Sequence, residues 1–330
     1  MKTIRWGIIG CGDVTEVKSG PGFQKATNSE LIAVMRRQGN LAQDYAKRHE
    51  VKKWYDDADA LIQDPEVDIV YIATPPAFHM EYALRCAKAG KPVYVEKPMA
   101  RNFEECEAMI AACQQAKVPL FVAYYRRALP RFIKIKELID QGKIGDICFV
   151  NITLYQKPRI DELSEATRPW RVIPELAGAG KFMDLASHTL DVLDYILGPV
   201  NEALGMASNQ GGLYKAEDMV TASLKFGSRI HGVGTWCFTA FADYDMNEIV
   251  GSKGKIKFST FGKEPIELIN EDGKTEFSID NPIHIQQPLI QTIVDELNGN
   301  GTCPSNGISG ARTNKVMDDI LRSYRMAELR

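Results

Sequence analysis

The sequence has little of what marks several common protein classes. Its seven cysteines form no Cys-x-x-Cys pair and are odd in number, which argues against a disulfide framework and a thiolate metal site. It has no run of about 20 apolar residues that would span a membrane. It also has no apolar signal stretch within Met1–Gly12 and no long basic run. These absences predict a cytoplasmic protein with reduced thiols that binds no metal, membrane or nucleic acid.

Apolar residues, by contrast, are plentiful enough for a sizeable core. The 330 residues are 45% hydrophobic, and 40 basic residues nearly balance 43 acidic ones, for a net charge of −3. A chain of this length typically forms about two domains. A change of pattern near Tyr124 predicts one domain over residues 1–123 and a second over residues 124–330.

Residues 1–123 alternate short Val- and Ile-rich runs with amphipathic stretches such as Met80–Ala89 and Glu104–Ala116. The runs suit strands that are buried on both faces. They are Ile4–Ile9, Leu31–Met35, Ile69–Ala73, Val93–Glu96 and Leu120–Ala123. This strand–helix–strand alternation predicts an α/β fold with a doubly wound parallel sheet.

The pattern of residues 124–330 predicts an α+β domain on a large, mostly antiparallel sheet. The dipeptides Gly227-Ser228 and Asp272-Gly273 are typical of the turns of β-hairpins. Expected strands are Ile147–Tyr155, Met219–Phe226, Arg229–Trp236, Lys255–Thr260, Ile266–Ile269 and Thr275–Ile279. Expected helices are residues 130–141, 182–197, 286–297 and 309–328. These helices are too few to cover both sheet faces, and Val233–Phe238 and Lys255–Phe258 mix apolar with polar residues. We therefore expect a homodimer or homotetramer that pairs through this sheet.

The segment Gly7–Val14 supplies the Gly-x-Gly that begins a dinucleotide-binding fingerprint, at the end of the first predicted strand. Such glycines let the backbone approach a pyrophosphate, and N–H groups of the following helix bind that anion. The third fingerprint position holds Thr15 rather than a small residue. The strand–turn–helix context favours a cofactor site over an ordinary glycine turn.

Three more features follow predicted strands, where ligands bind in open parallel sheets. Arg36 and Arg37 stand where a NAD enzyme usually places an acid for the ribose 2′-hydroxyl, and their guanidinium groups match a 2′-phosphate instead. We therefore favour NADP(H) over NAD(H), against the alternative of two solvated arginines. Thr74-Pro75-Pro76 and Glu96-Lys97-Pro98 are either rigid loops or walls of the crevice that also collects Gly10 and Arg36.

Asp184 and His188 are four residues apart on the predicted helix 182–197, so they share one face. A carboxylate beside an imidazole orients the ring, which suits proton exchange with an alcohol or carbonyl group. Taken alone, the pair would be an ordinary surface contact.

Taken in order, these motifs resemble the Gfo/Idh/MocA family, named for glucose–fructose oxidoreductase and inositol dehydrogenase. The resemblance spans essentially the whole chain and rests on Gly7–Gly12, Thr74-Pro75-Pro76 with His79, Glu96-Lys97-Pro98, Gly180–Asp184, His188 and Asp191. It implies a Rossmann domain followed by an open-faced mixed-sheet domain. Thr15, Ala179 and Ala186 depart from the family pattern and affect the expected backbone geometry.

The resemblance also implies site roles. Lys97, Asp184 and His188 would be catalytic: the lysine polarises the reacting oxygen, the histidine exchanges its proton, and a cis Lys97–Pro98 bond aims the lysine. Implied substrate contacts are Tyr125, Arg126, Trp170, Arg171, Asp184 and His188. Expected cofactor contacts are Gly10, Cys11, Gly12, Asp13, Val14, Arg36, Arg37, Thr74, Pro75, His79, Glu96 and Lys97.

These features predict an NAD(P)-dependent dehydrogenase or reductase of a sugar, polyol or related cyclic carbonyl compound. One alternative is a glycosidase that oxidises its sugar transiently and regenerates NAD, and a tightly held NAD would favour it. Another is a nucleotide-sensing regulator without turnover, against which Lys97, Asp184 and His188 count.

Overall fold

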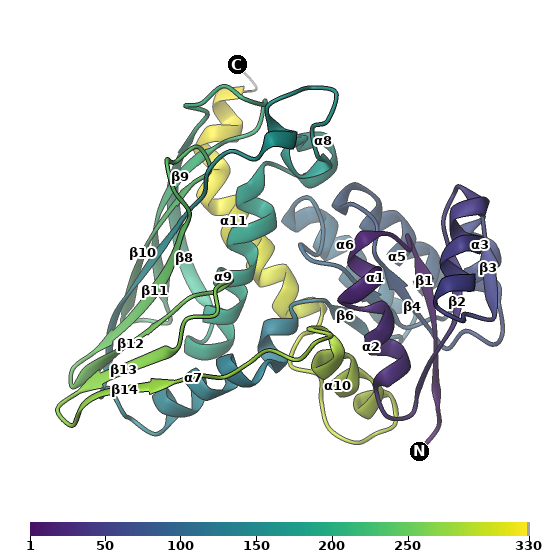
Figure 1. Ribbon diagram of the computed structural model, residues 1–330, viewed down its shortest axis with the longest axis horizontal. Coiled ribbons are helices and arrows are strands. Elements are labelled where there is room, and N and C mark those ends of the chain that lie inside the picture. The colour runs from purple at the N-terminus through teal and green to yellow at the C-terminus, as the bar shows by residue number, and fades with distance from the viewer. Residues whose placement is uncertain (329–330) are drawn as a thin grey trace. The chain divides into compact units, whose positions relative to one another are not determined.

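The computed structural model describes residues 1–328, which form two compact units (Figure 1). Unit 1 comprises Met1–Leu129 and Asn281–Ala311, and unit 2 comprises Pro130–Asp280 and the chain from Arg312. The first boundary lies close to the predicted one, but residues 281–311 differ from the prediction, which placed them in the second domain. The chain returns to unit 1 because Gln286 bonds to Tyr94, and Asn306 forms an antiparallel bridge with Phe121.

Unit 1 is built on a six-stranded parallel sheet in the order β3-β2-β1-β4-β5-β6. The strands are β1 (Ile4–Ile9), β2 (Ser29–Met35), β3 (Lys53–Tyr55), β4 (Ile69–Ile72), β5 (Val93–Val95) and β6 (Leu120–Val122). The order reverses between β1 and β4, the position where doubly wound sheets bind ligands. The predicted parallel sheet is confirmed, with the short edge strand β3 added.

The helices of unit 1 lie between these strands, apart from the last one, which belongs to the segment 281–311. They are α1 (Asp13–Val17), α2 (Gly20–Lys25), α3 (Gly39–Arg48), α4 (Ala58–Gln63), α5 (His79–Lys88), α6 (Phe103–Gln115) and α10 (Gln287–Leu297), with the 3-10 turns η1 (Pro76–Phe78) and η2 (Tyr125–Ala128). Asn102 caps the amino terminus of α6, because its side chain accepts a hydrogen bond from the backbone N–H of Glu105.

Unit 2 is built on an eight-stranded sheet in the order β14-β13-β12-β11-β7-β10-β9-β8. The strands are β7 (Ile147–Tyr155), β8 (Val200–Ser208), β9 (Met219–Phe226), β10 (Ile230–Cys237), β11 (Tyr244–Gly251), β12 (Gly254–Phe258), β13 (Ile266–Asn270) and β14 (Gly273–Phe277). All neighbours are antiparallel except β7 and β10. The mostly antiparallel sheet is confirmed.

Helices cover one face of this sheet (Figure 1). The helical segments are α7 (Pro130–Asp140), η3 (Ile160–Glu162), η4 (Trp170–Val172), α8 (Pro174–Ala177), α9 (Lys181–Leu197) and α11 (Gly307–Glu328). The backbone of β8 lies so close to α11 that a Cβ atom at Gly205 would be 2.5 Å from Cγ2 of Ile320. Side chains on the other face, among them Phe149, Leu204 and Val233, are exposed. None of the helices within residues 1–328 is long and apolar enough to cross a membrane.

Candidate active site

The glycine turn between β1 and α1 has a backbone that only glycine adopts easily. Gly10 has a φ of +90°, and a Cβ atom there would lie 2.9 Å from Cγ2 of Thr74. The backbone N–H groups of Gly10 and Cys11 donate to the carbonyl oxygen of Met35, at 2.9 and 3.3 Å. Beside Gly12 the nearest atom to an added Cβ is 3.9 Å away, so this stretch of backbone remains open to a ligand.

Thr15, at the third fingerprint position, supports the turn through its own hydrogen bonds. Its hydroxyl donates to the carbonyl oxygen of Gly12 at 2.7 Å, and its side chain is fully buried. The carbonyl oxygen of Thr15 accepts the hydroxyl of Tyr45 at 2.8 Å. A Cβ atom at Gly20 would lie 2.2 Å from that same carbonyl oxygen. The close backbone approach therefore occurs at Gly20 rather than at the fingerprint position, and it leaves no room for a Cβ atom there.

Arg36 and Arg37 lie just past the end of β2, as their positions in the sequence predict. Nη1 of Arg36 donates to the carbonyl oxygen of Cys11 at 3.5 Å, so the guanidinium group lies at the glycine turn. The guanidinium carbon of Arg37 lies 5.5 Å from the centroid of the Phe78 ring, in η1.

Burial raises the pKa of the Cys11 thiol to about 11, so the thiol stays protonated at neutral pH.

His79 connects the loops that follow β4 and β5. Its ring is fully buried, with Nε2 2.7 Å from the carbonyl oxygen of Thr74 and Nδ1 3.2 Å from those of Pro98 and Met99. Burial lowers the pKa of this imidazole, and the hydrogen bonds to the three carbonyl oxygens act in the opposite direction. The geometry gives His79 a role in holding the two loops rather than in presenting charge to a ligand.

The loops around this turn fit a bound dinucleotide. Oγ1 of Thr74 is buried, yet has no hydrogen-bond partner among the described residues, although buried hydroxyls are normally paired. This hydroxyl, the backbone beside Gly12 and the guanidinium group of Arg36 all belong to the carboxyl-terminal edge of the sheet. Asp13 and Val14 occupy the first turn of α1, and Pro75 precedes η1. The residues present therefore match the polar groups of a nicotinamide dinucleotide.

Glu96 and Lys97 follow β5, and the Lys97–Pro98 peptide bond is cis, as the family resemblance implies. The Glu96 carboxylate is almost completely buried. It accepts hydrogen bonds from the hydroxyl of Tyr71, from Nε2 of Gln286 at 2.6 Å and from the backbone N–H of Lys97 at 3.1 Å. Its oxygens thus bind the protein interior and the backbone of the predicted catalytic lysine.

Tyr125 and Arg126, two predicted substrate contacts, lie in η2 after β6. Both side chains are buried, and the guanidinium carbon of Arg126 lies 5.0 Å from the centroid of the Tyr125 ring.

In unit 2, the start of α9 is fixed by a buried carboxylate. Both oxygens of Glu217 accept the N–H of Gly180, at 2.9 and 3.0 Å, and negative charge at a helix N-terminus is stabilising. A Cβ atom at Gly180 would lie 2.8 Å from the carbonyl oxygen of Glu217, so this close approach requires glycine. The first turns of α9, which carry Asp184 and His188, begin from this fixed point.

Three predicted substrate contacts meet beside this helix. Nε of Arg171 lies 3.2 Å from Oδ2 of Asp184, and its guanidinium carbon lies 4.7 Å from the centroid of the Trp170 ring. His188, one turn further along α9, is 4% exposed and packs edge-on against Phe261, with ring centroids 5.7 Å apart. A carboxylate, a guanidinium group and an imidazole can each bind a hydroxyl, and the imidazole can also exchange a proton with it.

The loop that carries Trp170 and Arg171 is attached to α9 by a buried ion pair. Nζ of Lys181 lies 3.0 Å from Oε1 of Glu162, and these side chains are 5% and 2% exposed. Breaking a buried pair by removing one partner typically costs about 3–5 kcal/mol. No motif in the sequence indicates this pair, because Glu162 lies in the short turn η3 outside the predicted helices and strands. Phe261, which packs on His188, and Phe78, which faces Arg37, also lie outside the predicted motifs.

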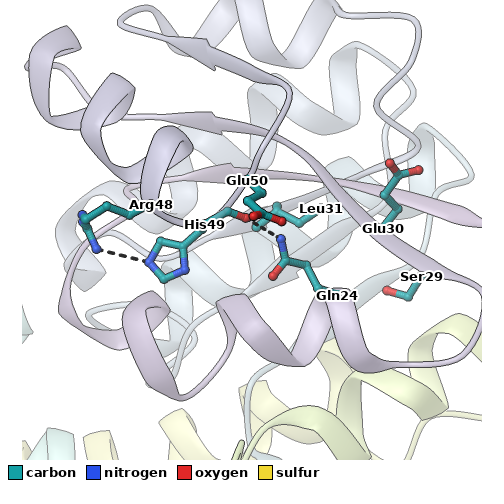
Figure 2. Close-up of a pocket in the computed structure, with 7 residues that line it drawn as sticks. All are labelled: Gln24, Ser29, Glu30, Leu31, Arg48, His49 and Glu50. Atoms are coloured by element: carbon teal, nitrogen blue, oxygen red, sulfur yellow. Dashed lines mark hydrogen bonds between the residues drawn. The ribbon is translucent and has the colours of Figure 1, made fainter.

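A polar depression at the start of β2 belongs to a different part of unit 1 (Figure 2). It is lined by Gln24, Ser29, Glu30, Leu31, Arg48, His49 and Glu50. None of these is a predicted site residue, and the depression lies at the amino-terminal end of β2, opposite to the edge where parallel sheets bind ligands. We therefore assign no catalytic role to it. Within residues 1–328 no cluster of three or more His, Cys, Asp or Glu residues could hold a metal ion.

Comparison with known proteins agrees with this arrangement. Residues 4–124 match the family described as "Oxidoreductase family, NAD-binding Rossmann fold", and residues 132–257 match the "GFO/IDH/MocA C-terminal domain". Oxidoreductase P35 of Formosa agariphila is 39% identical over 316 residues, which cover 96% of this chain and 97% of that protein. The myo-inositol 2-dehydrogenase of Thermotoga maritima is 30% identical over 279 residues, which cover 82% of this chain and 79% of that protein.

The fold is also shared with solved structures. A levoglucosan dehydrogenase in complex with NADH and levoglucosan superimposes with a TM-score of 0.85 over 98% of this chain and 97% of that chain, at 24% identity. This likeness supports the two-unit architecture, and the family matches and relatives support the chemistry. The chain therefore belongs to the Gfo/Idh/MocA family and is an NAD(P)-dependent oxidoreductase.

Proposed function

We propose that this protein is a dehydrogenase or reductase that moves a hydride between NADP(H) and a cyclic polyol, sugar or related carbonyl compound. The observation that carries the substrate class is the contact of Arg171 with Asp184 on the helix that bears His188, because these groups suit a polyhydroxylated molecule. The similarity to a myo-inositol 2-dehydrogenase supports the same class. The free state of all seven cysteines is consistent with a cytoplasmic location.

The bound nicotinamide supplies or accepts the hydride, and the protein's own residues handle the oxygen and its proton. We propose that Lys97 donates a hydrogen bond to the reacting oxygen and so favours the developing alkoxide. His188 takes the hydroxyl proton during oxidation and returns it during reduction. Asp184, paired with Arg171, orients the substrate and the imidazole.

The cofactor would be held by the residues at the carboxyl-terminal edge of the unit 1 sheet. In this proposal the glycine turn and the first turn of α1 bind the pyrophosphate, and the Thr74 hydroxyl pairs with a polar group of the cofactor. Arg36 contacts the 2′-phosphate, and Arg37, beside Phe78, contributes less. His79 acts on cofactor binding by holding the loop from which Thr74 extends, and Glu96 holds the backbone of Lys97.

The cofactor preference gives a first test. Arg36→Asp should weaken NADPH binding by roughly 1.5–3 kcal/mol, the range for a hydrogen bond to a charged group, and leave NADH binding nearly unchanged. Fluorescence titration with each nucleotide measures both affinities. Lys47→Asp, which makes the same charge change at an exposed position on α3, should leave both unchanged. Tighter binding of NADH than of NADPH by the wild-type protein would contradict the preference.

We also propose that the protein is a homodimer or homotetramer that pairs through the exposed face of the unit 2 sheet. Five apolar side chains on this face expose between 41% and 76% of their surface: Phe149 of β7, Leu204 and Met206 of β8, Val233 of β10 and Tyr244 of β11. Exposed apolar side chains gathered on one face mark interfaces. The segment Lys255–Phe258 contributes differently from the expectation, because Ile256 and Phe258 are buried and only its lysines lie on this face.

Val233→Glu tests this pairing. Val233 lies in the middle of β10, between Asn151 of β7 and Ser223 of β9, so a carboxylate there would be desolvated without a partner at a packed interface. We expect light scattering at micromolar concentration to show a shift toward monomer with unchanged circular dichroism. Leu84→Glu, an equivalent change at an exposed site on α5, should preserve the oligomer. A monomeric wild-type protein would disprove the proposal.

A further inference from the structure

A network of buried hydrogen bonds supports the Glu96-Lys97-Pro98 loop. The hydroxyl of Tyr94 donates to Oε1 of Gln286 at 3.0 Å, and Nε2 of Gln286 donates to Oε1 of Glu96 at 2.6 Å. The hydroxyl of Tyr71 donates to the same carboxylate oxygen, and Oε2 of Glu96 accepts the backbone N–H of Lys97 at 3.1 Å. Tyr71, Tyr94 and Gln286 have no measurable exposure to solvent.

The members of this network come from distant parts of the sequence. Tyr71 lies on β4 and Tyr94 on β5, whereas Gln286 is 190 residues from Glu96 and directly precedes α10. The Tyr71 and Tyr94 rings stack with centroids 4.9 Å apart, and the backbone N–H of Gln286 donates to the carbonyl oxygen of Lys18 at 3.3 Å. Packing and hydrogen bonds therefore hold each donor in one orientation.

Each hydrogen-bond donor in this network keeps its proton. Burial, and then the negative charge of Glu96, raise the pKa of Tyr71 and of Tyr94 well above the ordinary value for tyrosine. The amide of Gln286 can accept from one neighbour and donate to the other at any pH. A residue that cannot do both would leave the buried Tyr94 hydroxyl without its acceptor or the Glu96 carboxylate with one buried donor fewer, which is costly.

We propose that Gln286 is a positioning residue for the reaction: with Tyr71 and Tyr94 it holds the Glu96 carboxylate, which holds the backbone of Lys97. This inference rests on the proposed role of Lys97. The segment that returns from unit 2 to unit 1 thereby completes the support of the catalytic lysine. Small errors in the position of a reacting group are expensive, since a displacement of about 1 Å can cost on the order of 10²-fold in rate.

The test compares Gln286→Leu with Gln291→Leu. Gln291 lies on α10 and bonds to Thr27 and Asp295, so the control changes the docking of the same helix without touching Glu96. In Gln286→Leu we expect single-turnover hydride transfer to slow by on the order of 10- to 10²-fold with little change in NADPH affinity. Gln291→Leu should transfer hydride at the wild-type rate. Equal losses in both variants, or a loss fully explained by weaker NADPH binding, would overturn the proposal.

Tyr94→Phe keeps the test valid if Gln286→Leu does not fold. It removes only the hydroxyl that donates to Gln286, and we expect a smaller but measurable slowing of hydride transfer. A wild-type rate in this variant would count against the network.

A measurement without turnover separates this inference from the proposed function. After reductive ¹³C-methylation of the lysines, the resonance of Lys97, assigned with Lys97→Arg, reports the environment of its side chain. It should shift in Gln286→Leu and stay unchanged in Gln291→Leu. If the wild-type enzyme reduces no substrate, the proposed function fails, whereas an unmoved Lys97 resonance in Gln286→Leu contradicts the positioning role itself.

Discussion

Lys97→Met should lower turnover by a factor on the order of 10² to 10³, the usual loss when one electrostatic stabiliser of a transition state is removed. The methionine side chain has nearly the same length, but it cannot donate a hydrogen bond to the reacting oxygen. NADPH affinity should change little, because the cis Lys97–Pro98 backbone is held by Glu96 and by the His79 contact with Pro98. Single-turnover hydride transfer and nucleotide titration measure the two effects separately.

Two controls decide between catalysis and support of the loop. Lys88→Met makes the same change at an exposed position on α5 and should leave the rate unaffected. If Lys97 only supported its loop, Lys97→Met would chiefly lower the melting temperature. Near-normal hydride transfer in that variant would remove Lys97 from the mechanism.

His188→Asn should lower the rate by roughly 10² to 10⁴, the contribution of a general acid–base group. The direction of the pH effect follows from the role of the imidazole. Oxidation needs the neutral ring to accept the hydroxyl proton, so the wild-type rate of oxidation should fall as pH decreases, and the rate of reduction should fall as pH increases. In His188→Asn the corresponding limb of each profile should be flat.

The exposed His231 on β10 provides the matched control, since His231→Asn should retain the wild-type profile. Asp184→Asn should be milder than His188→Asn if Asp184 only orients its neighbours. A larger loss would indicate that its carboxylate, which pairs with Arg171, binds a substrate hydroxyl as well. A pH profile of His188→Asn identical to that of the wild type would exclude the histidine as the acid–base group.

The sequence predicts best the strands whose own residues have the apolar–polar alternation of a sheet with one buried face. β7 and β9 have the predicted bounds, since apolar and polar residues alternate over Val150–Leu154 of β7 and Val220–Phe226 of β9. β8, with Asn, Glu, Gly and Ser among its residues, has little intrinsic strand preference and becomes a strand through its pairing with β9. β11 was missed for the same reason: its polar residues fit a strand only beside β7 and β12.

The candidate site divides in the same way. Arg36 and the loop with Lys97 could be placed from sequence because the carboxyl ends of parallel strands share one edge of the sheet. The family resemblance implies Arg171 and Asp184 as substrate contacts, but it does not imply the ion pair between them. Two interactions could not be predicted, because each joins segments that are distant in sequence and no local pattern indicates them. They are the hydrogen bond between Gln286 and Glu96 and the ion pair between Glu162 and Lys181.

The most direct test of the central claim is transfer of deuterium from substrate to cofactor. Wild-type protein is mixed with NADP⁺ and a panel of inositols and cyclic sugars deuterated at the carbinol carbons, and the nucleotide is analysed by mass spectrometry. We predict that at least one substrate yields NADPH carrying one deuterium, and that His188→Asn forms it far more slowly. Absorbance of reduced nicotinamide without deuterium in it, or no reduction with any member of the panel under NADP⁺ or NAD⁺, would contradict the account.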